Sequence, residues 1–304
     1  MSRIAFLGSP EAALPTLTAL AGAHDVALVI TRPDKPRGRG RSPKPTPVNE
    51  EARRLGLRVA TPETTGDLEA ALNSAAPLDL GVVVAYGRIL RPGALRIPER
   101  GMLNLHFSLL PRWRGAAPVS RALMAGDPMT GVTIFRIDEG LDTGSVLTAQ
   151  ALDIEPEETA GSLTTRLATT GAGLMIRVVP AYLAGEIEPV PQSDEGLTHA
   201  AKIEPGERAI RVDGLQRDEV NRVRALSPTP GATLDIDEET HQILRARVSP
   251  HQPKPGTWID VSGVPVAGLA DGGIELMTIL PPGKKVMEGA AWLRGLRRRS
   301  GRVA

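Results

Sequence analysis

Residues 3–31, RIAFLGSPEAALPTLTALAGAHDVALVIT, decide how the N-terminal part of the chain folds. This stretch begins and ends with short apolar runs, at residues 3–8 and 25–31, which have the pattern of strands buried on both faces of a parallel sheet. The Ala- and Leu-rich stretch between them suits a helix, with Pro15 in its first turn. The sequence therefore predicts a β-α-β unit at the start of the chain.

The same alternation continues along the next 150 residues. Further apolar runs predict strands at residues 80–86, 102–107 and 132–137, and helical patterns occur at residues 48–55 and 118–125. A long helix is expected over residues 159–185, because Leu163 and Leu167 recur at helical spacing after Thr159, which suits an N-cap. This pattern predicts an α/β fold with an open sheet.

The composition and the hydrophobic pattern of the sequence change after residue 185. The next stretch is polar and broken by Pro189, Pro191 and Pro205, as is typical of an interdomain linker. Beyond it, short apolar runs separated by Pro and Gly predict antiparallel strands of a small β-barrel at residues 242–248, 257–261, 264–269 and 273–279. We therefore expect a first domain over residues 1–185, a linker over 186–204 and a smaller C-terminal domain over 205–304.

Composition limits the class of protein. A chain of 304 residues exceeds the usual size of one domain. It has no cysteine, which excludes disulfides, thiolate metal sites and a cysteine nucleophile. We see no signal peptide and no apolar run long enough to cross a membrane, so we expect a cytoplasmic protein with no membrane partner.

Charge is unevenly distributed along the chain. The totals nearly balance, at 36 basic and 35 acidic side chains. Residues 32–44 nevertheless hold six basic side chains and one acidic one, and residues 284–304 hold seven and one. Either segment alone is explained by solvation, but together, on an otherwise acidic chain, they indicate a polyanionic partner such as nucleic acid.

Residues 102–118, MLNLHFSLLPRWRGAAP, carry the first group of candidate site residues. Side chains alternate along a strand, so Asn104, His106 and Ser108 share one face at its carboxyl end, where open α/β sheets place their ligands. The alternative is that Asn104 and His106 are a hydrogen-bonded polar pair with a structural role only. The apolar Leu109–Pro111 turn that follows favours a pocket wall for a flat organic ligand.

A second candidate lies at residues 138–144, DEGLDTG, where Gly140 and Gly144 bracket Asp142. Glycines allow a sharp turn that would bring this carboxylate against the neighbouring strand, although the spacing alone favours an ordinary Asp-Gly loop. If Asp142 reaches His106, the cluster holds an amide, an imidazole and a carboxylate without a nucleophilic Ser or Cys. That set suits acyl transfer by direct attack of a substrate amine.

Other cofactor sites find no support in the sequence. The turn after the first apolar run reads GSPEAAL, which matches neither a dinucleotide-binding nor a phosphate-binding glycine motif. The five His residues are scattered and have no standard metal-ligand spacing. We therefore expect no metal and no nucleotide cofactor.

The chain resembles the folate-dependent formyltransferases. The matching segments are LNLHFSLLPRWRGAAP, GVTIFRIDEGLDTGSVL, TRPDKPRGRG, AAKIEP, RALSPTPGA and PPGKKVM. The first two signatures are shared with glycinamide ribonucleotide and amino-sugar formyltransferases. The basic segment after residue 31 and the C-terminal segments resemble the tRNA-dependent branch, the methionyl-tRNA formyltransferase family.

This resemblance implies a Rossmann-like domain that binds 10-formyltetrahydrofolate, followed by an OB-like barrel that binds initiator methionyl-tRNA. By position, the catalytic residues would be Asn104, His106 and Asp142. The folate-binding residues would be Ser108, Leu109, Leu110 and Pro111, together with Tyr86, Gly87 and Ile89. The tRNA-binding residues would be Arg37, Arg39, Arg41, Lys44, Lys284 and Lys285.

Two alternatives stay open at this stage. One is a formyltransferase with a small amine acceptor, which would have no use for the basic segments. The other is a tRNA-binding module whose catalytic domain has decayed, against which the intact Asn, His and Asp set argues. We expect a monomer, because the sequence pattern leaves no large apolar face over.

Overall fold

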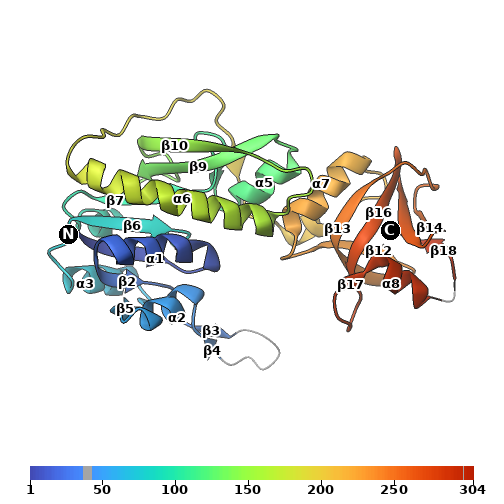
Figure 1. Ribbon diagram of the computed structural model, residues 1–304, viewed down its shortest axis with the longest axis horizontal. Coiled ribbons are helices and arrows are strands. Elements are labelled where there is room, and N and C mark those ends of the chain that lie inside the picture. Colours follow the sequence, from blue (N-terminus) through green and yellow to red (C-terminus); the bar gives the residue numbers. More distant parts are fainter. Residues whose placement is uncertain (37–42, 297) are drawn as a thin grey trace. The chain divides into compact units, whose positions relative to one another are not determined.

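The computed structural model describes residues 1–36, 43–296 and 298–304, and these residues form two compact units (Figure 1). The first unit comprises Met1–Ala116, Thr130–Leu152 and Thr164–Ala200; the second comprises Ala117–Met129, Asp153–Leu163 and Ala201–Ala304. Two stretches from the middle of the sequence thus belong to the second unit. The linear boundaries expected above, 1–185, 186–204 and 205–304, stay a prediction.

The first unit is built on an open mixed sheet with the strand order β10-β9-β7-β6-β1-β2-β5. Strands β1, β2, β5, β6 and β7 pair in parallel, whereas β9 runs antiparallel to β7. The strands are β1 (Arg3–Gly8), β2 (Asp25–Ile30), β5 (Val59–Ala60), β6 (Leu80–Val84), β7 (Met102–His106), β9 (Met129–Arg136) and β10 (Val146–Asp153). The predicted α/β fold with an open sheet is confirmed.

Helices cover both faces of this sheet. Leu68 and Leu72 of helix α3 pack with Ala5 and Leu7 of β1 on one face. On the other face α6 lies so close to β7 that a Cβ on Gly171 would collide with the Leu105 side chain. The helices of this part of the chain are α1 (Leu14–Ala23), α2 (Pro47–Arg54), α3 (Thr65–Asn73), α4 (Pro92–Leu95) and α6 (Ala160–Leu183).

Local sequence explains where two of these helices begin. Thr46 accepts a hydrogen bond from the Asn49 amide at 3.1 Å and precedes Pro47, the first residue of α2. Thr64 and Asp67 form a reciprocal capping box at the start of α3. Such caps satisfy amide groups that the first helical turn leaves free.

A smaller ladder lies beside the main sheet. Strand β8 (Arg114–Gly115) pairs in parallel with β11 (His199–Ala200), so a stretch expected to be a linker runs back along the first unit. A further short pair joins β3 (Lys35–Pro36) and β4 (Pro43–Lys44) on either side of the residues that are not described.

The second unit contains an antiparallel sheet with the order β12-β13-β16-β15-β14-β18, and β17 pairs with β16. Its edges meet, because Ile236 of β12 bridges Val303 and Asp235 exchanges backbone hydrogen bonds of 3.1 and 3.0 Å with Ala304. The strands are β12 (Ala232–Ile236), β13 (Glu239–Ser249), β14 (Thr257–Val261), β15 (Val264–Leu269), β16 (Gly272–Leu280), β17 (Met287–Glu288) and β18 (Ser300–Arg302). The sheet curls as the predicted OB-like barrel requires.

The barrel core is aromatic and aliphatic. The rings of Trp258 and Trp292 lie 5.5 Å apart, and Val223 and Leu226 pack into the same cluster. Helices α5 (Pro118–Met124), α7 (Gln216–Leu226) and α8 (Gly289–Arg294) complete the unit. Across the residues that the structure describes, none of the helices combines the length and the apolar character needed to cross a membrane.

Candidate active site

His106 ends strand β7 and is almost buried, with 6% of its surface exposed. Its Nε2 atom lies 2.9 Å from the Trp113 carbonyl oxygen. A carbonyl can only accept, so Nε2 carries the proton and donates it. The nitrogen that is left for a reacting group is therefore Nδ1.

The Asp142 carboxylate lies against that nitrogen, with Oδ2 3.7 Å from His106 Nδ1. The same oxygen accepts a hydrogen bond from the Gly115 amide at 2.8 Å. Asp142 has a φ of +55°, in the left-handed region, and a Cβ on Gly144 would collide with the Arg136 carbonyl. The glycine-bracketed turn thus lets the chain bring Asp142 to His106, as the sequence predicts.

Burial governs the protonation of the imidazole. It lowers the pKa of His106 below the ordinary value of 6.5, while the Asp142 charge and the hydrogen bond to the Trp113 carbonyl act in the opposite direction. The imidazole is therefore neutral at neutral pH. A buried neutral histidine beside a carboxylate is suited to accept a proton during a reaction.

Asn104 lies two residues before His106 on β7, so the two side chains emerge on the same face of the sheet. It is half-buried, between Val83 of β6 and Phe135 of β9 in the strand ladder. Its place agrees with a role beside His106. That role stays a prediction.

The Leu109–Pro111 turn begins three residues after His106. Thr133 of β9 holds it, because its hydroxyl donates to the Ser108 carbonyl at 2.7 Å and accepts from the Leu110 amide at 3.1 Å. Ser108 is fully buried, and its own hydroxyl donates to the Arg112 carbonyl at 2.6 Å. The side chains of residues 109–111 are half-buried, so they keep apolar surface for a ligand.

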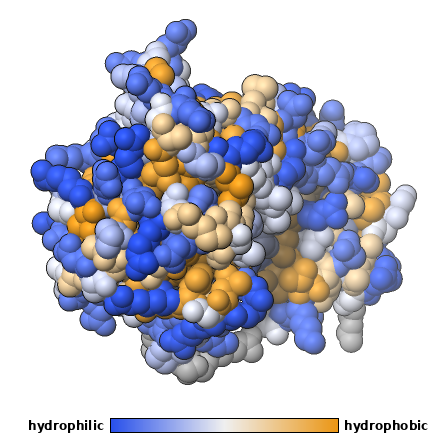
Figure 2. All heavy atoms as spheres, turned by 60° about the vertical axis from the view of Figure 1, so that its left-hand side comes forward, coloured by the Kyte–Doolittle hydropathy of each residue, from blue (hydrophilic) through white to orange (hydrophobic). Residues whose placement is uncertain are grey.

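The other expected folate contacts lie after strand β6. The ring of Tyr86 is packed in the core and 1% exposed, and burial raises the pKa of its hydroxyl. A ligand would therefore meet the backbone at Tyr86 and Gly87 rather than the phenol. Ile89 is 83% exposed and Leu141, next to Asp142, is 63% exposed. Figure 2 shows that hydrophobic residues reach one face of the molecule among hydrophilic ones.

The residues expected to bind tRNA fall into separate groups. Arg37, Arg39 and Arg41 lie outside the described residues. Lys44 is exposed on β4. Lys284 and Lys285 are exposed in the turn that follows β16, in the second unit. Their roles stay predictions.

Sequence reasoning did not identify Gln192 as a site residue. Its Nε2 donates to the carbonyls of Asp142 and Gly144, each at 2.8 Å, and its Oε1 accepts from the nearly buried Arg114. A glutamine in a proline-broken polar stretch carries no local signal of such contacts. Trp113 and Arg114 lie in a segment that the sequence pattern singled out, but that pattern does not reveal which residues they contact.

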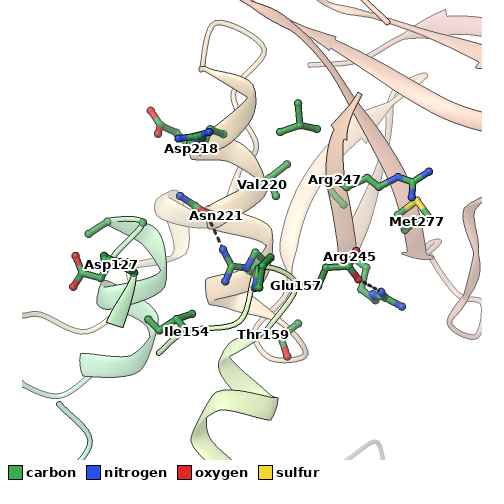
Figure 3. A pocket seen from close by; sticks show the side chains of 18 of the residues that line it. Asp127, Ile154, Glu157, Thr159, Asp218, Val220, Asn221, Arg245, Arg247 and Met277 are labelled. Atoms are coloured by element: carbon green, nitrogen blue, oxygen red, sulfur yellow. Dashed lines mark hydrogen bonds and ion pairs between the residues drawn. The ribbon is translucent and has the colours of Figure 1, made fainter. Parts of the chain in front are cut away.

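A separate pocket of about 910 Å³ lies within the second unit, between α7 and β13 (Figure 3). Three of the four arginines that line it have partners: Arg224 donates to the carbonyls of Glu155 and Glu158, Arg245 pairs with Glu157 at 2.8 Å, and Arg247 pairs with Glu275. We assign this pocket no role in the chemistry. In the described part of the chain, no group of three or more His, Cys, Asp or Glu side chains is placed to hold a metal ion.

Known proteins resemble this chain over almost its whole length. The family profile described as formyl transferase matches residues 2–179, and that of the formyl transferase C-terminal domain matches residues 202–297. A methionyl-tRNA formyltransferase from Halorhodospira halophila is 46% identical over 97% of each chain, and one from Acidiphilium cryptum is 44% identical over 96% of each.

Solved structures agree on the fold. An N-formyltransferase from Helicobacter canadensis, crystallised with folinic acid and dTDP-3-aminofucose, has a TM-score of 0.69 at 18% identity, covering 91% of this chain and 99% of its own. Phosphoribosylglycinamide formyltransferase from Streptococcus pneumoniae has a TM-score of 0.51 at 27% identity, covering 60% of this chain and 99% of its own. The family profiles and the sequence relatives show that the chain belongs to the methionyl-tRNA formyltransferase family.

Proposed function

We propose that this protein transfers the formyl group of 10-formyltetrahydrofolate to the α-amino group of initiator methionyl-tRNA, giving N-formylmethionyl-tRNA for translation initiation in the cytoplasm. The observation that carries the proposal is the buried His106 imidazole, whose free Nδ1 faces the Asp142 carboxylate at 3.7 Å. It lies beside an apolar turn, on a chain that matches methionyl-tRNA formyltransferases over its length. Both substrates must meet at this imidazole.

The reaction begins when the neutral α-amino nitrogen attacks the formyl carbon. As the new C–N bond forms, negative charge develops on the formyl oxygen, and the Asn104 amide is assigned to donate to it. His106 Nδ1 accepts the amine proton, most simply through one water molecule. The imidazolium that results also stabilises the oxygen, and Asp142 balances its charge.

The second half of the reaction releases the folate. The bond between the formyl carbon and the folate nitrogen breaks, and that nitrogen takes up the proton from His106. The products are N-formylmethionyl-tRNA and tetrahydrofolate, and His106 returns to its neutral state. The hydrogen bond from Nε2 to the Trp113 carbonyl persists throughout, so it fixes the ring and its tautomer.

We assign folate binding to residues that follow strands β6 and β7. Half-buried Leu109, Leu110 and Pro111 supply apolar surface for a flat ring system, and the exposed side chain of Ile89 supplies more. Gly87 is exposed and has a left-handed φ of +78°, so its backbone is available for polar contacts. Folate binding by these residues and by Ser108 and Tyr86 is part of the proposal.

For the tRNA, we assign phosphate contacts to the basic segments, through Arg37, Arg39, Arg41, Lys44, Lys284 and Lys285. Only eight residues of the chain are aromatic, so contacts with the tRNA sugar-phosphate backbone should outnumber stacking contacts with its bases. We expect the protein to act as a monomer, which sedimentation analysis would check.

One assay separates this function from its rivals. Purified protein is given 10-formyltetrahydrofolate with charged initiator tRNA, with charged elongator methionyl-tRNA, or with a small amine such as glycinamide ribonucleotide or a nucleotide amino sugar. We expect rapid formylation of initiator methionyl-tRNA only. Formylation of a small amine but of neither tRNA would overturn the proposed acceptor, and tRNA binding without any transfer would show a decayed enzyme.

The catalytic role of the imidazole has its own test. His106→Ala should lower kcat by about 100- to 1000-fold, because a proton acceptor and a donor to the developing oxyanion are lost together. His251→Ala, at an exposed histidine of the second unit, is the matched control. Activity of the His106 variant near the parent level, with the substrates still bound, would refute the role.

A further inference from the structure

Residues 190–200, here called the strap, run along the first unit beside both groups that contact His106. At its start, Val190 exchanges backbone hydrogen bonds of 2.8 Å with Val146, just after the Asp142 turn. At its end, His199 and Ala200 pair with Arg114 and Gly115. The strap is therefore fixed on both sides of the candidate active site.

Gln192 of the strap holds the Asp142 turn through a fully used side-chain amide. Its Nε2 donates to the Asp142 and Gly144 carbonyls, each at 2.8 Å. Its Oε1 accepts from Arg114 Nε and Nη2 at 2.9 and 2.8 Å. A primary amide has two protons to donate, so this arrangement leaves no alternative orientation of the Gln192 side chain.

Thr198 of the strap holds the other partner of His106. Its hydroxyl accepts from the Trp113 amide at 2.9 Å, and its carbonyl accepts from the Arg114 amide at 3.0 Å. Trp113, at φ +64°, is thereby kept in a left-handed conformation with its carbonyl toward His106 Nε2. The strap therefore holds both groups that face the ring nitrogens of His106, the Asp142 carboxylate at Nδ1 and the Trp113 carbonyl at Nε2.

We propose that the strap is a positioning element for the transfer reaction, and that Gln192 is the positioning residue that places the Asp142 carboxylate beside His106. This inference rests on the proposed function, in which Asp142 supports the imidazole. Asp142 has a left-handed backbone in a turn whose tip is exposed, and such a conformation persists only where its surroundings hold it. The two hydrogen bonds that Gln192 Nε2 donates to this turn keep it in that conformation.

A pair of substitutions separates positioning from packing. Gln192→Glu keeps the size of the side chain but turns an oxygen toward two carbonyl oxygens, whereas Gln192→Ala removes the side chain. If the donors matter, Gln192→Glu lowers kcat at least as much as Gln192→Ala, by about 10- to 100-fold, with KM for folate and tRNA within about twofold of the parent. If volume alone matters, Gln192→Glu is active and only Gln192→Ala is impaired, which overturns the proposal.

The same changes at Gln150 are the matched control. Gln150 is exposed on β10 of the same unit, so Gln150→Glu and Gln150→Ala should leave kcat at the parent value. A double-mutant cycle adds the link to Asp142: in an Asp142→Asn background, Gln192→Ala should lower kcat by less than about twofold further. Additive losses would mean that Gln192 acts elsewhere.

A readout without turnover separates this inference from the proposed function. The Gly115 amide donates to the Asp142 carboxylate, so its hydrogen exchange reports whether the carboxylate is in place. Gln192→Ala should speed exchange at Gly115 by about 10-fold or more, while exchange in the barrel strands is unchanged. Parent-like exchange at Gly115 would overturn the strap proposal even if the parent formylates tRNA. If Gly115 exchanges fast in Gln192→Ala but the parent protein formylates no amine, the strap proposal stands and the proposed function is overturned.

Discussion

At the scale of single residues, the proposed mechanism makes activity depend on the charge state of His106. In that mechanism neutral His106 accepts the amine proton, so kcat should fall as pH drops through the pKa of His106, which burial places below 6.5, and should be level at neutral pH. Because the Asp142 charge raises that pKa, Asp142→Asn should move the acidic limb of the profile to lower pH while it lowers kcat. The pH dependence of kcat, measured in both proteins, checks the two directions.

Glu139→Gln is the matched control for that profile. Glu139 is an exposed carboxylate of the same turn, and its change should leave both the acidic limb and kcat in place. An acidic limb that moves upward in Asp142→Asn would show that the carboxylate does not face a proton-accepting imidazole.

The sequence singled out His106 and Asp142 as candidates, and the glycines on either side of Asp142 allow a sharp turn, but the spacing alone favoured an ordinary loop over a contact between them. It did not identify which nitrogen of His106 is free, since that depends on the Trp113 carbonyl, a backbone atom without a sequence signature. The burial of the Tyr86 ring could not be predicted either, because it follows from how the end of β6 packs rather than from the neighbours of Tyr86 in the sequence.

At the scale of elements, strand β9 supports the apolar turn through one threonine. Thr133→Val removes the hydroxyl that bonds to Ser108 and Leu110, so it should lower the free energy of unfolding by about 1–3 kcal/mol. It should also raise KM for 10-formyltetrahydrofolate more than it lowers kcat. Urea unfolding and initial-rate kinetics at varied folate concentration measure the two effects.

Thr130→Val on the same strand is a matched control. Thr130 is also buried, but its hydroxyl is without a hydrogen-bond partner in the described residues, so the methyl group should leave stability unchanged or raise it. Equal losses in the two variants would mean that the turn does not depend on the Thr133 hydroxyl.

Elements with clear periodicity were predictable, and others were not. Strands at residues 257–261 and 264–269 agree with β14 and β15, because short apolar runs flank a turn at Ser262 and Gly263. Strand β10 went unpredicted, because it is largely exposed at the sheet edge and its sequence VLTAQALD alternates poorly. Helix α7 is strongly polar and owes its place to packing against β13.

At the scale of the whole molecule, binding of tRNA should depend on salt through the basic segments. Each phosphate contact that is lost should lower the slope of log K against log salt by about one. We therefore expect Lys284→Ala and Lys285→Ala each to flatten the salt dependence of tRNA binding, with kcat at saturating tRNA retained. Filter binding over a range of salt concentrations measures the slope.

Lys254→Ala, at another exposed lysine of the second unit, should leave the slope unchanged. If all three variants behave like the parent, the lysines after β16 are only solvated and the phosphate contacts lie elsewhere on the chain.

The interleaving of the two units along the chain has a consequence for protein engineering. Because Ala117–Met129 and Asp153–Leu163 belong with the barrel, and Arg224 of α7 donates to carbonyls at residues 155 and 158, no single cut releases a complete C-terminal module. A chimaera that takes only residues 201–304 from a homologue would set the homologue's α7 against the loop at residues 155–158 of this chain. Graft junctions for swapping acceptor specificity must therefore include both inserted stretches.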